Sequence, residues 1–77
     1  MADPKHSGPG RRVHLAPRQL QIALLTADGL SAKEIAALLD ISAGTVEIQR
    51  SLIYQTVQVK NAVMLTRWLI REGLLEP

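Results

Sequence analysis

Apolar residues recur at helical spacing in four stretches of this chain, and residues that start or stop helices bound each stretch. The first stretch begins at Pro17, which suits a first helical position, and Gly29 follows it as a left-handed stop. Its apolar positions are Leu20, Ala23, Leu24 and Ala27. This pattern predicts a helix over residues 17–28.

The second stretch has the clearest start. Ser31 and Glu34 form a capping box, in which each side chain satisfies an exposed backbone N–H group of the other residue. Ile35, Ala36 and Leu39 then form an apolar stripe at helical spacing. These residues predict a helix over 32–39.

The third stretch follows after only three residues, 40–42, with Ser42 as its N-cap. We expect a helix over 43–57 whose apolar face is formed by Val46, Leu52, Ile53 and Val57. Because two helices joined so tightly cannot fold back as a long antiparallel hairpin, we expect them to cross steeply, as in a helix-turn-helix.

The last stretch predicts a helix over 61–72, starting after Asn61 and stopped by Gly73. No stretch has the alternating pattern of a strand, so the sequence predicts an all-α, four-helix domain. The expected core consists of Leu20, Leu25, Ile35, Ala36, Leu39, Ile41, Val46, Ile53 and Leu65.

Composition narrows the classes of function. The chain has 77 residues, enough for one domain, and 47% of them are hydrophobic, as expected for a folded protein. It has no cysteine, and its two histidines, His6 and His14, have no third ligand near them, so we expect no metal, no cofactor and no enzyme activity. It also has no membrane-length apolar run and no signal-peptide pattern, so we expect a cytoplasmic protein.

The net charge of +2 comes entirely from residues 1–12, which contain Lys5, Arg11, Arg12 and Asp3. This segment is rich in Pro and Gly, and we expect it to be a disordered basic arm ahead of a helical domain formed by residues 13–77. Residues 13–77 contain six basic and six acidic groups, so the expected folded domain is neutral. A neutral domain is unusual for a protein that binds nucleic acid, because such domains usually carry a basic face.

Several short motifs resemble, in order and spacing, the helix-turn-helix domain of the bacterial LuxR/NarL/GerE-type regulators, over the segment from Leu15 to Leu75. The matching residues are Pro17-Arg18, Gly29-Leu30-Ser31, Lys33-Glu34-Ile35-Ala36, Ile41-Ser42, Gly44-Thr45-Val46, Ile53-Tyr54, Val59 and Gly73-Leu74-Leu75. The resemblance implies a transcription regulator whose third helix enters the major groove of duplex DNA and whose fourth helix commonly forms a dimer. Members usually carry a receiver or ligand-binding domain ahead of the motif, but because this chain starts at Met1 with an untagged-looking tail, we expect a stand-alone domain and not one excised from a longer regulator.

The resemblance gives candidate DNA-binding residues in the motif and in the arm: Lys33, Thr45, Glu47, Ile48, Arg50, Ser51, Lys60, Arg11 and Arg12. The chain departs from the family where DNA would approach. Glu47 stands where the family commonly has Lys or Arg, and Leu38, Gln49, Thr56 and Ala62 replace other residues that are basic or His in many members. A carboxylate is repelled by phosphate, although a glutamate can accept a hydrogen bond from the amino group of cytosine.

A second group of departures adds apolar residues where the family usually has polar ones, at Leu24, Leu38, Val63 and Met64. Either these residues form an interface or they belong to the domain's own core. The candidate interface residues are Val63, Met64, Arg67, Trp68 and Leu24. Two functions remain open: a dimeric DNA-binding regulator, or a degenerate helix-turn-helix module that binds another regulatory protein without binding DNA.

Overall fold

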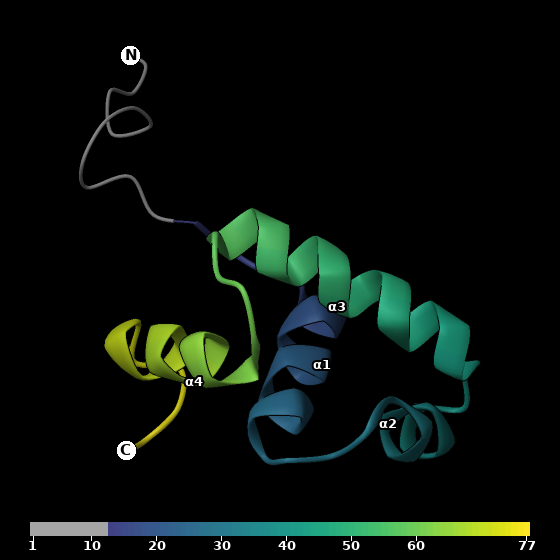
Figure 1. Cartoon of the computed structure of the whole chain (residues 1–77). Helices are drawn as coiled ribbons and strands as arrows, with labels where there is room; N and C mark the ends of the chain where they lie inside the picture. Colours follow the sequence, from purple (N-terminus) through teal and green to yellow (C-terminus); the bar gives the residue numbers. More distant parts are fainter. Residues whose placement is uncertain (1–12) are drawn as a thin grey trace.

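The computed structural model describes residues 13–77, in which four helices follow one another: α1 (Pro17–Ala27), α2 (Ala32–Leu39), α3 (Ala43–Val57) and α4 (Ala62–Arg71) (Figure 1). There is no strand in this part of the chain, which confirms the all-α prediction. Every helix boundary lies within one residue of its predicted position. The expected basic arm, residues 1–12, lies outside the described residues.

Three of the helices begin with a side chain that caps the first turn. The Ser31 hydroxyl accepts a hydrogen bond from the Glu34 N–H at 3.1 Å, and the Glu34 carboxylate accepts one from the Ser31 N–H at 2.8 Å, so the predicted capping box is confirmed. Ser42 and Asn61 each accept a hydrogen bond from the N–H group three residues ahead, at 3.0 and 2.9 Å. These contacts satisfy backbone donors that have no partner within the helix, and they fix where each helix starts.

Residues with positive φ follow the helices. Gly29 and Gly73 have φ angles of 97° and 75°, the left-handed conformation that a glycine adopts at little cost. Helices α2 and α3 instead end on Asp40 and Gln58, which carry side chains and still adopt φ angles of 58° and 60°. Asp40 allows the chain to turn from α2 into α3 within three residues.

Helix α1 lies at the centre of the domain and contacts each of the other three helices, whereas α2 and α4 do not contact each other. In Figure 1, α3 runs across the view while α2 is seen nearly end-on below its start, so the two helices cross steeply. This arrangement confirms the helix-turn-helix geometry expected from the short connection between them.

The core forms where α1 meets α2, α3 and α4. The fully buried side chains are Ile22, Ile35, Val46, Ile53, Leu65 and Leu69, and Ala23, Ala32, Ala36, Val57 and Trp68 complete the buried cluster. Five of the nine expected core residues are among them, and Leu20, Leu25, Leu39 and Ile41 are half-buried against this cluster. Ile22 and Leu69 were not in the expected core, although both are fully buried.

The prediction that Leu52 belongs to the inward face of α3 is wrong, because its exposed fraction is 43%. Val46, Ile53 and Val57 set the buried side of this helix. Successive residues are rotated by about 100° around an α-helix, so the immediate neighbour of a fully buried Ile53 is turned well away from the core.

None of the helices in residues 13–77 combines the length and the apolar character that a membrane crossing requires.

Candidate nucleic-acid interface

One side of α3 faces away from the rest of the domain. Gly44, Ile48, Ser51 and Gln55 recur at spacings of three and four residues and are all exposed. Thr45 and Leu52 flank this row on one side and Glu47 flanks it on the other, and all three are exposed. We call these seven residues the outer face of α3. Because none of its residues is buried, this face could enter a groove without unpacking the core.

The first turn of the outer face is held by the helix cap. The Ser42 hydroxyl donates to the Thr45 Oγ1 at 2.9 Å and accepts from the Thr45 N–H at 3.0 Å, so the Thr45 side chain is held against the cap as an acceptor. A side chain built at Gly44 would meet only the Ser42 hydroxyl, at 3.9 Å. The backbone of this turn is therefore open to close approach from outside.

Charge on α3 is neutralised within the helix. The guanidinium of Arg50 lies 3.3 Å from the Glu47 carboxylate, and the exposed fractions of the two side chains are 25% and 62%. Arg50 is the only basic residue of α3, and it lies beside the outer face, not on it. The Glu47 carboxylate is exposed on the outer face, but its negative charge is paired with the Arg50 guanidinium.

The other candidate cations surround the motif. Lys33 is exposed in the first turn of α2, where the partial positive charge of the helix N-terminus adds to its own. Lys60 is exposed in the connection between α3 and α4, and Arg18 is exposed at the start of α1. Arg11 and Arg12 lie outside the described residues.

Of the five candidate interface residues, three are exposed, one is half-buried and one is buried. Val63 and Met64 are exposed by 63% and 38%, and Arg67 is also exposed, so these three form a stripe on the outer side of α4. Trp68 is buried with only 8% exposed, and Leu24 is half-buried against the core cluster. Trp68 therefore belongs to the core, because it lies on the side of α4 that packs inward with Leu65 and Leu69. Leu24, on α1, belongs largely to the core as well, because it packs against the buried cluster.

Three members of the outer face, Gly44, Leu52 and Gln55, are not among the DNA-binding residues that the sequence predicts. All three fall in register with Ile48, since Gly44 precedes it by four positions, Leu52 follows it by four and Gln55 follows it by seven. Helical spacing from Ile48 therefore predicts that these residues are exposed on the same face, but the apolar character of Leu52 favours its assignment to the core.

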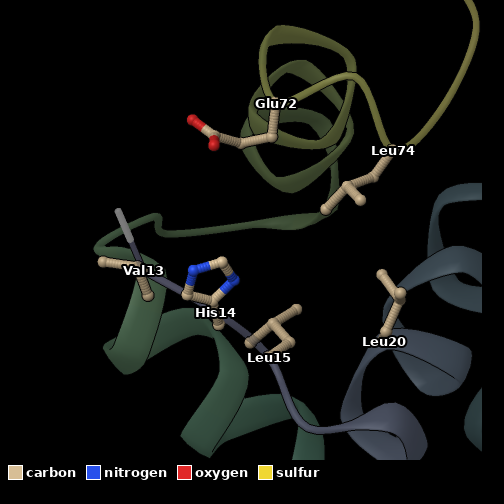
Figure 2. Close-up of a pocket in the computed structure, with 6 residues that line it drawn as sticks. All are labelled: Val13, His14, Leu15, Leu20, Glu72 and Leu74. Carbon is tan, nitrogen blue, oxygen red and sulfur yellow. The ribbon is translucent and has the colours of Figure 1, made fainter. Parts of the chain in front are cut away.

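The structure also contains a small cavity of about 160 Å³ between the start and the end of the domain (Figure 2). Its walls come from residues 13–15, from Leu20 and from the segment after α4, and Figure 2 shows His14 and Glu72 at its edge among otherwise apolar side chains. The described residues contain no cluster of three His, Cys, Asp or Glu side chains that could hold a metal ion. The cavity thus lies between the two ends of the domain, and none of its lining residues belongs to the outer face of α3.

Comparison with known proteins gives matches over most of the chain. The model of the family described as bacterial regulatory proteins, luxR family, matches residues 13–69. A probable transcriptional regulator ycf29 of Porphyra purpurea is 38% identical over 63 residues, and a protein of the same description from Pyropia yezoensis is 34% identical over 64 residues. These alignments cover 82% and 83% of this chain but 30% and 29% of the relatives, so the chain spans less than a third of their length.

Proposed function

The chain belongs to the LuxR family of bacterial regulatory proteins, and on this premise we propose that it binds duplex DNA through the outer face of α3 and regulates transcription as a dimer. Proteins of this family are regulators and not enzymes, as the sequence predicts. We assign the whole of residues 13–77 to the DNA-binding domain, because Leu75, beyond the matched segment, packs against the core cluster. With DNA as its ligand, we place the protein in the cytoplasm.

The observation that carries this proposal is the position of α3. Val46, Ile53 and Val57 pack its buried side into the core, whereas all the side chains of the outer face are exposed. The major groove of B-form DNA is about 12 Å wide and admits an α-helix, and the first turns of a recognition helix are the ones that contact base edges. The outer face begins in the first turn of α3, at Gly44 and Thr45.

Phosphate contacts would come from the residues around this face. Of the five exposed cations in residues 13–77, we assign Lys33, Lys60 and Arg18 to these contacts, and Arg11 and Arg12 precede them in the chain. Each phosphate contact releases counterions from DNA, so binding through so few cations is weak and falls only gradually with salt. Binding therefore depends strongly on pairing two copies of the domain.

We assign the dimer contact to the stripe of Val63, Met64 and Arg67 on α4. Val63 and Arg67 lie on the side of α4 opposite its buried residues, Met64 lies at the edge of the buried side, and two of the three members are apolar. A two-fold dimer buries the same patch on both copies and sets the distance between two recognition helices. The positive charge of Arg67 places this residue at the rim of such a contact.

The experiment is fluorescence anisotropy with a labelled random-sequence duplex of about 20 base pairs, at roughly 50 and 200 mM salt, a fourfold range over which even a few phosphate contacts change the affinity measurably. We expect binding at the lower salt concentration that weakens at the higher one. Lys33→Ala should lower the slope of log K against log salt by about one unit. Arg71→Ala, which removes an exposed cation from the end of α4, is the matched control and should leave the slope unchanged.

A protein-interaction module is the second candidate, and one observation favours it specifically. The outer face of α3 carries no Lys or Arg and exposes the apolar side chains of Ile48 and Leu52, and Leu38 on α2 is exposed by 63%. Such a surface is suited to another regulatory protein as well as to a groove. Absence of duplex binding even at the lower salt concentration would favour this alternative over DNA binding.

A further inference from the structure

We propose that α3 reads A·T base pairs through the methyl groups of thymine, with Ile48 as the principal contact and Leu52 as the second. This inference rests on the proposed DNA binding and specifies which base chemistry the outer face recognises. Thymine alone among the four bases carries a methyl group in the major groove, and apolar side chains recognise it by contact.

Ile48 occupies the middle of the outer face. Its side chain is 62% exposed, although isoleucine is one of the residue types most often buried. The position one turn before it is Gly44, which has no side chain to hold a base away from the helix. An incoming base edge would therefore meet the aliphatic group of Ile48 first.

Two of the polar side chains beside Ile48 have partners within the protein, and the exposed Ser51 hydroxyl can contact any base and therefore does not distinguish between them. The Thr45 hydroxyl is hydrogen-bonded to Ser42, and the Glu47 carboxylate is paired with Arg50. The commonest contact with guanine uses two donors of an Arg or Lys, and the outer face has no such residue. Its first turns thus have apolar contact available for thymine and no cation available for guanine.

The spacing of the two apolar residues also fits a row of bases. Leu52 follows Ile48 by four residues, a displacement of about 6 Å along the helix axis. Two successive base steps of DNA cover about 6.8 Å. One helix can therefore place Ile48 and Leu52 against methyl groups that are two base pairs apart.

The test compares duplexes that differ only in methyl groups. A duplex of about 20 base pairs made of mixed A·T pairs is measured beside the same duplex with deoxyuridine in place of thymidine, and a G·C duplex is measured with and without 5-methylcytosine. We expect the deoxyuridine duplex to bind roughly four- to fifteenfold more weakly, the range for burial of one or two methyl groups. The 5-methylcytosine duplex should bind more tightly than its unmethylated counterpart.

Ile48→Ala should lower the ratio of thymidine to deoxyuridine affinities to about four or less, the part that Leu52 alone can supply, with helicity unchanged because the Ile48 side chain is exposed. Leu38→Ala is the matched control, since Leu38 is an apolar side chain of similar exposure on α2, and it should keep the wild-type ratio. Duplex binding with equal affinity for thymidine and deoxyuridine, or a ratio that Ile48→Ala leaves intact, would overturn this inference alone. No binding to any duplex would overturn the proposed function and this inference with it.

Discussion

The guanidinium of Arg50 donates a hydrogen bond to the carboxylate of Glu47, with 3.3 Å between Nη2 and Oε1, one turn apart on α3. A pair this exposed adds at most about 1 kcal/mol to the free energy of unfolding. The pair also bears on the proposed DNA binding, because Glu47 adds a negative charge to the outer face of α3 and Arg50, which it engages, is the only cation on this helix.

Glu47→Lys should therefore strengthen binding to random-sequence duplex DNA. The substitution replaces a charge that phosphate repels with one that it attracts, and the slope of log K against log salt should steepen by about one unit. Anisotropy titrations at several salt concentrations measure this slope. Glu76→Lys makes the same charge change at the end of the chain, far along the sequence from α3, and should have a much smaller effect. Tight, sequence-specific binding that is lost in Glu47→Ala would contradict this view and make Glu47 itself a base reader.

Met64→Glu should shift the protein from dimer to monomer. A carboxylate placed in an apolar contact between two copies loses its water without gaining a partner, which is costly. Because Met64 is partly exposed on α4, the helix should stay folded in the monomer. Sedimentation velocity measures the shift, and circular dichroism checks the helicity. Leu38→Glu introduces the same charge on α2 and should leave sedimentation unchanged. A wild type that is monomeric at high concentration would rule out the dimer contact.

Ser31→Ala should lower the free energy of unfolding by about 0.5–2 kcal/mol, because it removes the acceptor for a backbone N–H group at the start of α2. Glu34→Ala should cost less, since it removes only the reciprocal contact to the Ser31 N–H. Urea denaturation gives both values. Equal midpoints for wild type and Ser31→Ala would mean that this cap does not hold the helix start in solution.

Gln58→Gly should stabilise the domain by up to about 1 kcal/mol. Gln58 adopts a φ angle of 60°, a left-handed conformation that a residue with a Cβ atom adopts only at a cost and that glycine adopts freely. Asp40→Gly should bring a smaller gain, because aspartate tolerates this region better than glutamine does. Urea midpoints for the two variants test the order, and a loss of stability in Gln58→Gly would show that the strain at this position is absent in solution.

The helix boundaries were predictable because they depend on contacts between near neighbours. The caps at Ser31, Ser42 and Asn61 each bridge three residues, and the glycine after α1 acts through its own backbone. Such contacts are fixed by local sequence whatever the rest of the fold does. The outer position of Glu47 was predictable for the same reason, since the phase of α3 follows from its own apolar residues.

The candidate site was only partly predictable. The sequence indicated that Thr45, Ile48 and Ser51 belong with the third helix, and the structure brings them onto one exposed face. Leu52 was assigned to the core because an apolar side chain beside Ile53 favours burial. The error arose because the buried stripe of this long helix is narrow, and the contacts with α1 and α2 decide where its edge lies.

The sequence alone determined that residues 13–77 form four helices, where each begins and ends, and that α2 and α3 cross steeply, because capping, helical periodicity and a three-residue connection act locally. Only the tertiary structure decided which apolar residues remain outside. Met64 and Trp68 lie one turn apart on α4, yet Trp68 is buried and Met64 is partly exposed. The packing of α4 against α1 and α3 buries Leu65, Trp68 and Leu69 and leaves Met64 at the edge of the covered side, and the position of that edge depends on how whole helices pack together.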